Sequence, residues 1–270
     1  MSTGRLYRTE GIVIGRRDQG EADRVLRLCT PAGKTDVLAK GARKLRSRKA
    51  GHIELFTRSA FVLSRVPNYW DIISQAETLD PHAALRGDLL RGGYARYAVE
   101  ILDRFFTEGE GGTAVFDLLD HTLTWLCEHD ELDAVIRFYE QHLLGLAGFR
   151  PELFRCVGTH DEHVLLRADG HGDDRRPFGF APELGGALCL DCYDARKREG
   201  DVLPLSPNAL RLLQGCQRGS FTEVAARPIS TGLHRQAERL MRHYITYHLE
   251  QDVKAGAFLR QIKRTHRRGL

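Results

Sequence analysis

The chain has 270 residues, of which 42% are hydrophobic and 28% are charged, so it is long enough for two or three domains with ordinary cores. No apolar run approaches the roughly 20 residues needed to cross a bilayer, and residues 1–28 lack the apolar centre of a signal peptide. We therefore expect a cytoplasmic protein, in which six cysteines suit metal binding better than a disulfide framework.

Positive charge is concentrated at the N-terminal end. Residues 1–65 contain 15 Lys and Arg against six Asp and Glu, whereas the rest of the chain is net negative. Such a basic end indicates contact with nucleic acid or with an anionic surface. A membrane surface fits less well, because the basic stretch has no apolar face to insert.

The first 80 residues are typical of a small β-barrel. Short segments rich in β-branched residues and separated by turn signals predict five strands, at 11–16, 24–30, 35–40, 53–64 and 70–76. Five strands at this spacing favour an antiparallel barrel of the OB type, which is common among nucleic-acid-binding proteins. Phe56 and Phe61 are expected in its core, whereas Tyr69 and Trp70, beside a turn, could stack on bases.

A basic run extends from the third predicted strand into the loop after it. Residues 34–49 carry seven Lys and Arg against one acid, so this segment repels itself and is predicted to be a solvated loop or a strand edge. It could hold a polyanion through sequence-independent phosphate contacts, or it could simply be a soluble loop. With two arginines of the first strand, the candidate DNA-contacting residues are Lys34, Lys40, Arg43, Lys44, Arg46, Arg48, Lys49, Arg16 and Arg17.

Helices are predicted to follow the barrel. Asp80-Pro81 is typical of a helix start, and five apolar residues then recur three or four apart, which places them on one helix face. These residues are Leu90, Tyr94, Tyr97, Ile101 and Phe105. Two more amphipathic helices are predicted at 115–127 and 132–147, and nothing in this segment indicates catalysis.

A cysteine group comes next along the chain. Cys189 and Cys192 have the two-residue spacing that directs two thiolates at one Zn²⁺. Upstream, Cys156 and His160 could complete a structural zinc site, with His163 as a less close substitute. The four predicted ligands are therefore Cys156, His160, Cys189 and Cys192. Reduced thiols and surface histidines without a metal are the alternative.

The same group of residues permits a catalytic alternative. His160 and Glu162, followed by Cys189 and Cys192, imitate the His-x-Glu and Pro-Cys-x-x-Cys pattern of zinc-dependent nucleobase deaminases. Leu188 stands where that pattern has proline, and the residues after His160 are typical of a strand rather than a helix. Apart from the cysteines, a third hypothesis is a scaffold that binds only proteins, through the helical bundle, and for which the basic loop would be incidental.

The C-terminal part is predicted to be helical with a basic end. Ser206-Pro207 should begin a helix that reaches Cys216, and a long helix is predicted at 232–250. The final LRQIKRTHRRGL contains no acid. This end could be a second phosphate-binding tail, and its terminal position favours a frayed segment.

Three stretches together resemble the RecO family of bacterial recombination mediators. They are GIVIGRRDQGEADRVLRLCTPAGKTDVLAKGARKLRSR, LLGLAGFRPELFRC and GGALCLDC. The resemblance implies an α+β fold: an OB domain at 1–80, a helical bundle at 81–150, a zinc-knuckle-like insertion at 151–198, completing helices at 199–250 and a basic tail at 251–270.

The resemblance also implies a function without bond cleavage. Members of the family bind and anneal single-stranded DNA, and bind double-stranded DNA, in recombinational repair. The implied partners are RecR, the single-stranded-DNA-binding protein and, indirectly, the RecA recombinase, which places the protein at the nucleoid. One departure concerns the metal: zinc-binding members have two Cys-x-x-Cys pairs, but Thr159 stands at the second position of the first pair here. Since some members lack the cysteines, zinc would be structural.

Overall fold

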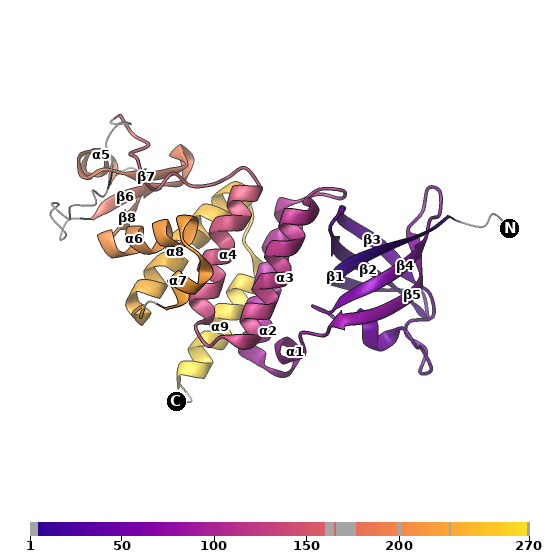
Figure 1. The fold of residues 1–270 in the computed structure, drawn as a ribbon. Coiled ribbons are helices and arrows are strands. Elements are labelled where there is room, and N and C mark those ends of the chain that lie inside the picture. Colours follow the sequence, from indigo (N-terminus) through magenta and orange to yellow (C-terminus); the bar gives the residue numbers. More distant parts are fainter. Residues whose placement is uncertain (1–4, 160–164, 166–176, 199–200, 227, 269–270) are drawn as a thin grey trace. The chain divides into compact units, whose positions relative to one another are not determined.

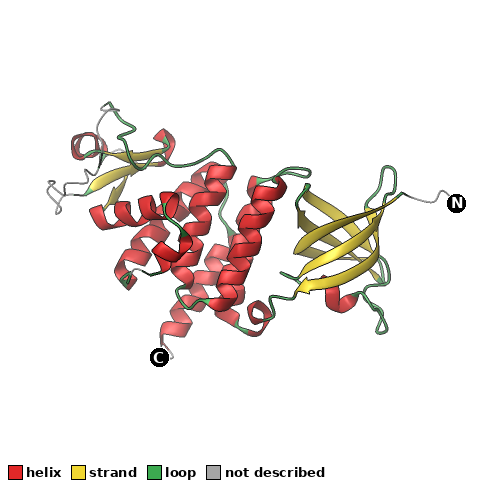
Figure 2. Ribbon diagram, viewed as in Figure 1, coloured by secondary structure: helices red, strands yellow, loops and turns green. Residues whose placement is uncertain are grey.

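The fold is known from a computed structural model that describes residues 5–159, 165, 177–198, 201–226 and 228–268. The chain forms two compact units. The first unit combines residues 1–130 with 253–270, and the second contains residues 131–252. Strands dominate the N-terminal part and helices most of the remainder (Figure 2), which confirms the predicted α+β class.

A closed five-stranded barrel occupies the start of the chain (Figure 1). Its strands are β1 (Leu6–Gln19), β2 (Asp23–Thr30), β3 (Gly33–Ala39), β4 (Arg58–Ser64) and β5 (Asp71–Asp80). They are ordered β1-β2-β3-β5-β4, and β1 is long enough to pair with both β2 and β4. All pairs are antiparallel except β3 with β5. This order confirms the predicted OB-type barrel.

Alternating apolar residues fill the barrel. Leu26 and Leu28 of β2 and Val37 of β3 are fully buried in one core cluster with residues of the other strands. Phe61 is 1% exposed and Phe56 2%, so both lie in the core as predicted. Because side chains of a strand alternate between its faces, the residues between these core positions point out of the barrel.

The fourth strand is shorter than predicted. Residues 50–53 form a 3-10 helix, η1 (Ala50–Ile53), and Phe56 has a φ of 69°, so β4 begins only at Arg58. The Phe56 amide donates to the carbonyl oxygen of Val13 at 2.8 Å. Ile53 and Phe56 thus enter the core from an irregular segment, which their apolar, β-sheet-prone composition did not reveal.

Three helices of the first unit follow the barrel: α1 (Ala84–Gly87), α2 (Leu89–Phe105) and α3 (Gly112–Glu128). The prediction that Asp80 begins a helix is wrong. Asp80 ends β5 and accepts a hydrogen bond from the His82 amide at 2.8 Å, whereas Asp88 caps α2 by accepting from Leu90 and Arg91. Tyr94, Tyr97 and Ile101 are buried on one face of α2, as their spacing predicted.

The basic C-terminal segment is a helix, α9 (Lys254–Arg268), that packs against α2. The amides of Lys254 and Ala255 donate to the carboxylate of Glu100 in α2, and Leu259 and Ile262 are buried. The expectation of a frayed end is therefore wrong for these residues. Their amphipathic pattern has a buried apolar stripe that terminal position alone concealed.

The second unit contains a helical group and a small sheet. Its helices are α4 (Leu132–Leu146), α5 (Leu190–Arg196), α6 (Pro207–Arg218), α7 (Phe221–Ala225) and α8 (Thr231–Leu249). The sheet consists of β6 (Phe178–Ala181), β7 (Gly186–Leu188) and β8 (Leu203–Leu205), with a 3-10 helix, η2 (Pro182–Leu184), between the first two. Ser206 caps α6 and α8 begins near the predicted residue. None of the helices among the described residues is both long and apolar enough to cross a membrane.

Candidate nucleic-acid interface and metal site

The basic loop, residues 40–49, joins β3 to η1 and is anchored by its backbone. Gly41 has a φ of 66°, a conformation that favours glycine, and its amide donates to Asp23 Oδ1 at 2.7 Å. The Arg43 amide donates to the carbonyl oxygen of Ala22 at 2.9 Å. The loop is therefore held against the turn between β1 and β2.

Four basic residues of this loop present their charge to solvent. Lys40, Lys44, Arg46 and Arg48 are exposed, and none has an ion pair or hydrogen bond to a side chain among the residues that the structure describes. Leu45 between them is also fully exposed. The loop is therefore solvent-exposed, as its charge density predicted, and no acid of the described residues neutralises these four cations, so the loop stays a candidate surface for a polyanion.

Arg43 and Lys49 are partly committed within the protein. The Arg43 guanidinium donates to the Gly20 carbonyl at 3.1 Å and lies 3.4 Å from Asp18 Oδ2. Lys49 donates from Nζ to the Ile73 carbonyl oxygen, and its partial burial lowers its pKa. Both residues therefore hold the loop in place, in addition to any contact with a ligand.

Lys34 lies elsewhere and differs from the other candidates. Its side chain is buried, and Nζ donates to the carbonyl oxygen of Asp103 at 2.6 Å and to Asp103 Oδ1 at 2.8 Å. Lys34 lies near the start of β3, where its backbone also bonds to Glu110. The ammonium group thus joins the barrel to α2 within the first unit and is not available to a phosphate.

Arg16 and Arg17 point to opposite faces of β1, as neighbours on a strand do. Arg16 forms an ion pair with Glu54. Arg17 is 55% exposed in its side chain and lies over the Trp70 ring, 4.7 Å from the ring centroid. Because side chains alternate along the strand, Arg16 and Arg17 lie on two different surfaces. The sequence prediction had grouped both with a single DNA-contacting surface.

Tyr69, which is exposed, and Trp70, which is half-buried, form an aromatic platform in the connection between β4 and β5. Tyr69 is 54% exposed, and the two ring centroids are 5.0 Å apart. The guanidinium of Arg17 contacts the platform and supplies a cation beside it. Exposed rings next to a positive charge are what base stacking and phosphate contact require.

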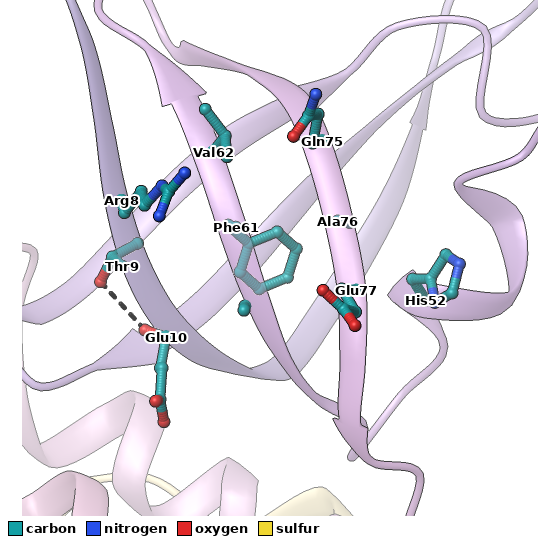
Figure 3. Close-up of a pocket in the computed structure, with 10 residues that line it drawn as sticks. Arg8, Thr9, Glu10, His52, Phe61, Val62, Gln75, Ala76 and Glu77 are labelled. Carbon is teal, nitrogen blue, oxygen red and sulfur yellow. Dashed lines mark hydrogen bonds between the residues drawn. The ribbon is translucent and has the colours of Figure 1, made fainter.

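A pocket of about 840 Å³ lies on a different face of the barrel, over β1, β4 and β5 (Figure 3). Its lining has mixed charge, since Arg8 and Glu10 of β1 and Glu77 of β5 line it together with Ala60, Phe61 and Val62 of β4. Glu10 is already bonded to Arg58, at 2.7 Å. Nothing in the sequence predicted this pocket, because its residues come from three strands, and its mixed charge does not favour a polyanion.

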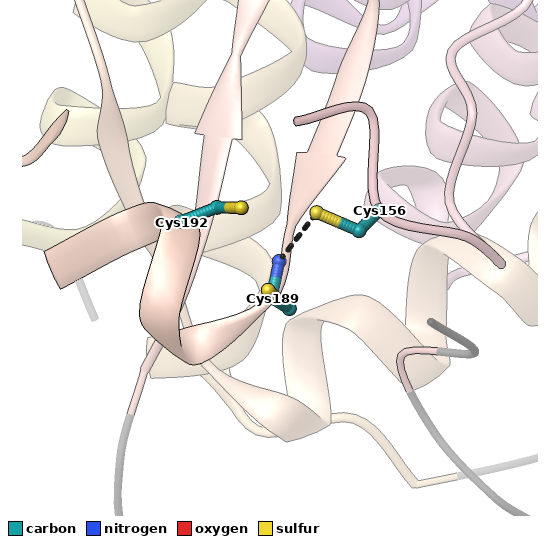
Figure 4. Close-up of side chains that lie close together, drawn as sticks. All are labelled: Cys156, Cys189 and Cys192. Atoms are coloured by element: carbon teal, nitrogen blue, oxygen red, sulfur yellow. Dashed lines mark hydrogen bonds between the residues drawn. The ribbon is translucent and has the colours of Figure 1, made fainter. Parts of the chain in front are cut away.

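Three of the four predicted metal ligands come together in the second unit. The Sγ atoms of Cys156, Cys189 and Cys192 all lie within 4.8 Å of one another, and all three residues are buried (Figure 4). Cys189 caps α5 and Cys192 lies in its first turn, so the two-residue spacing brings both thiols to one point. The remaining predicted ligand, His160, lies outside the described residues. So do His163, the substitute ligand, and Glu162, the residue of the deaminase hypothesis.

The backbone around the thiols suits thiolates. Cys156 Sγ accepts hydrogen bonds from the amides of Cys189 at 3.2 Å and Gly158 at 3.4 Å. A side chain at Gly158 would place its Cβ 2.7 Å from Cys192 Sγ, so glycine is needed for the close approach. Amide donors to sulfur stabilise the deprotonated form that binds metal.

The thiols of this cluster have unequal acidity. Burial tends to raise the pKa of Cys192, but hydrogen bonds from Thr159 and the neighbouring thiols outweigh it and lower the pKa to about 7. Burial raises the pKa of Cys189 to about 11. Thr159 Oγ1 lies 3.5 Å from Cys192 Sγ. Thr159 occupies the position at which a second Cys-x-x-Cys pair would have its second cysteine. The donor set of three clustered thiols fits Zn²⁺.

Comparison with known proteins gives consistent relatives over nearly the whole chain. Residues 1–82 match the family model described as recombination protein O N terminal, and residues 86–257 match recombination protein O C terminal. The DNA repair protein RecO of Roseiflexus sp. (strain RS-1) is 40% identical over 264 residues, which cover 97% of this chain and 88% of that protein.

Two further relatives carry the same name. The DNA repair protein RecO of Symbiobacterium thermophilum is 34% identical, with 96% of this chain and 98% of that protein covered. The protein of that name from Desulforamulus reducens is 32% identical, and the match covers 97% of each chain. The boundary between the two family models falls just after β5, where the barrel ends.

Proposed function

Because the chain belongs to the RecO family of recombination proteins, we propose that it acts in recombinational DNA repair by binding and annealing single-stranded DNA. The observation that carries this proposal is the exposed basic loop on an OB-type barrel that also presents an aromatic platform. The proposed function is binding, and it requires no bond cleavage.

Most of the affinity for DNA would come from contacts between basic side chains and the DNA phosphates. Lys40, Lys44, Arg46 and Arg48 are exposed and unneutralised, so they can replace the counterions of a DNA strand. Arg43 and Lys49 would add charge while they hold the loop. Because phosphate contacts carry no sequence information, one surface serves any strand that needs repair.

The aromatic platform would distinguish bases from a bare polyanion. A base can stack on Tyr69 or Trp70 while Arg17 contacts an adjacent phosphate. Stacking requires an unpaired base, whereas the basic loop can also contact the backbone of a duplex. Neutralised phosphates repel each other less, so a second complementary strand can approach and pair.

Family membership also suggests protein partners and a location in the cell. We propose that the protein meets DNA strands coated by the single-stranded-DNA-binding protein and acts with RecR to help load RecA. This assignment rests on membership of the family alone. On the same ground, we propose that the protein works at the nucleoid.

We further propose that the thiol cluster holds a structural zinc ion through Cys156, Cys189 and Cys192, with His160 as the fourth ligand. A tetrahedral zinc ion would crosslink the segment before β6 to the start of α5, and it would add stability rather than chemistry. The buried thiols and their amide donors support this proposal.

Fluorescence anisotropy of labelled single-stranded DNA tests the main proposal. The variant in which Lys44, Arg46 and Arg48 are replaced by Ala should bind at least tenfold more weakly at low salt. The slope of log affinity against log salt should also fall by about two to three, because fewer counterions are released.

A matched control removes the same charge elsewhere. Arg198, Arg235 and Arg239 are exposed in the second unit, and their replacement by Ala should leave affinity and slope nearly unchanged. Two unrelated DNA sequences should give the same result. An unchanged salt slope in the loop variant would contradict the proposal, as would failure of the wild-type protein to bind at low salt.

A further inference from the structure

A second cavity in the first unit has a composition different from that of the barrel pocket. Its volume is about 530 Å³, and it lies among β1, the start of α2 and α9. The side chains that matter below are Arg16 of the barrel, Leu89 and Arg96 of α2, and Phe258 of α9. A cavity of this volume accommodates a ligand the size of one nucleotide.

Two adjacent glycines of α2 line the cavity. Gly92 and Gly93 lie within α2, where each glycine costs about 1 kcal/mol relative to alanine. A Cβ at Gly92 would lie 2.5 Å from the Leu85 carbonyl oxygen, and one at Gly93 would lie 3.2 Å from Leu259 and Ile262 of α9. Close packing requires both glycines. Between Leu89 and Arg96, the residues of α2 that line the cavity are these two glycines.

The charge in the cavity favours an anion. Arg16, Arg86 and Arg96 line it together with Glu54 and Asp88. Glu54 forms an ion pair with Arg16, and Asp88 accepts from two neutral amides at the start of α2, so three arginines against two carboxylates leave one net positive charge at the cavity. Arg86 donates to the neutral carbonyl oxygens of Leu55 and Pro81, at 3.0 and 2.6 Å, so its positive charge is not cancelled.

Arg96 is the cation best placed to meet a ligand. It is exposed at the cavity, and no acid or carbonyl group of the described residues binds its guanidinium. An arginine in this position can donate two hydrogen bonds to one phosphate group. The cavity therefore contains a phosphate-binding group that the fold itself does not use.

The wall beside Arg96 is aromatic. Phe258 is 44% exposed and lines the cavity, although a helix that packs on α2 could have buried this ring. Leu89 is 68% exposed at the same cavity. An exposed ring next to an uncommitted arginine matches the two halves of a nucleotide, since a base stacks on the ring and its phosphate binds the guanidinium.

We propose that this cavity receives one nucleotide of a single strand, with the base against Phe258 and the phosphate at Arg96. A base that is paired in a duplex cannot turn into a cavity without loss of pairing and stacking energy. The cavity therefore makes the protein prefer single-stranded over double-stranded DNA. This inference rests on the proposed function, because it concerns the same ligand.

Anisotropy with a single strand and with the duplex of the same sequence tests the cavity. Phe258→Ala and Arg96→Glu should each weaken single-strand binding about fivefold or more, in line with the energy of one stacked base. Duplex binding should change less than twofold. A strand of abasic residues should be insensitive to Phe258→Ala but remain sensitive to Arg96→Glu, since it retains only the phosphates.

Matched controls lie in the second unit. Leu146→Ala shortens an exposed apolar side chain and Arg239→Glu reverses an exposed charge, and both should leave the preference for single strands unchanged. Circular dichroism melting of each variant checks that the fold is retained.

The two proposals fail separately. If the wild-type protein binds DNA but both cavity variants keep its preference for single strands, the cavity inference is wrong and the proposed function stands. Equal weakening of single-strand and duplex binding would also overturn the inference. If the wild-type protein binds neither form at low salt, the proposed function itself is wrong.

Discussion

Lys34 shows how one basic side chain serves structure rather than binding. Its ammonium group has two acceptors on a single residue of α2, Asp103, which also pairs with Arg27 of β2. Arg27 in turn bonds Asp36, and these contacts raise the pKa of Arg27. Ion pairs between the barrel cations Lys34 and Arg27 and the carboxylate of Asp103 thus join the barrel to α2.

Removal of this ammonium group should cost stability. Lys34→Ala leaves the Asp103 carboxylate with one fewer partner, so the free energy of unfolding should fall by about 2 kcal/mol. Urea denaturation measures the change. Single-strand affinity at temperatures where the variant is folded should stay within twofold of the wild type, and Lys44→Ala should show the reverse pattern. A large loss of affinity in folded Lys34→Ala would show that the ammonium group reaches DNA.

Two buried cysteines outside the metal cluster predict sensitivity to alkali. Burial raises the pKa values of Cys29 and Cys216 to about 12 from the ordinary value of 9.0. Above pH 9 the unfolded chain therefore loses thiol protons that the folded chain keeps, so stability falls as pH rises toward 12.

Denaturation at pH 8 and pH 10.5 tests this sign. Each buried thiol should contribute a loss on the order of 2 kcal/mol at the higher pH. Cys29→Ala and Cys216→Ala should reduce the difference in stability between the two pH values, whatever they do to stability at pH 8. If the difference is the same in wild type and variants, ionisation of these thiols does not control alkaline stability.

At the scale of elements, the thiol cluster connects segments that have little regular structure of their own. Strands β6, β7 and β8 are three or four residues long, and such a small sheet is marginal without another constraint. Gln214 and Gln217 of α6 donate to the carbonyl oxygens of Leu153 and Pro151, both at 2.8 Å. A metal at the cluster would add the constraint that these contacts leave incomplete.

Metal analysis of the purified protein should find about one zinc ion per chain. Cys192→Ser should lose the metal and lower the melting temperature, because the ion stabilises only the folded form. Its affinity for single-stranded DNA should stay within twofold of the wild type, since the basic loop belongs to the other unit. Cys127→Ser, outside the cluster, is the control. Zinc-free wild-type protein with an unchanged melting temperature would contradict this prediction.

At the scale of the whole molecule, the first unit is discontinuous in sequence. Residues 131–252 form a unit of their own between the barrel with its helices and the returning α9. The sequence analysis predicted consecutive domains and set residues 251–270 apart as a tail. It therefore separated α9 from the unit to which this helix belongs. Leu259 and Ile262 pack against α2 at Gly93. A substitution in α9 should therefore lower the stability of helices that stand much earlier in the sequence.

Hydrogen exchange can localise that effect. Leu259→Ala should destabilise the first unit by about 2 to 4 kcal/mol, as a buried leucine normally does. Amides of residues 84–128 should exchange faster, whereas those of residues 132–146 and 207–249 should exchange at their wild-type rates. Gln261→Ala, on the exposed side of α9, is the control. Faster exchange in both units alike would mean that they unfold as one.

The sequence predicted those features that depend on local patterns. Short segments rich in β-branched residues, separated by turn signals, identified the barrel. Charge density identified the exposed loop, and two-residue spacing identified the thiol cluster. Features that depend on distant partners were missed. Lys34 was grouped with the loop because Asp103 is far away in sequence, and the cavity at Gly92 and Gly93 requires three elements to meet.

The return of α9 to the first unit bears on how the protein is synthesised. A ribosome completes residues 131–252 before it makes α9, so the second unit can fold while the first still lacks a helix. Phe258 belongs to that late helix, and the cavity that it lines therefore forms last. The proposed contact of a base with Phe258 would therefore be the last part of the binding surface to form during translation, after the basic loop and the aromatic platform.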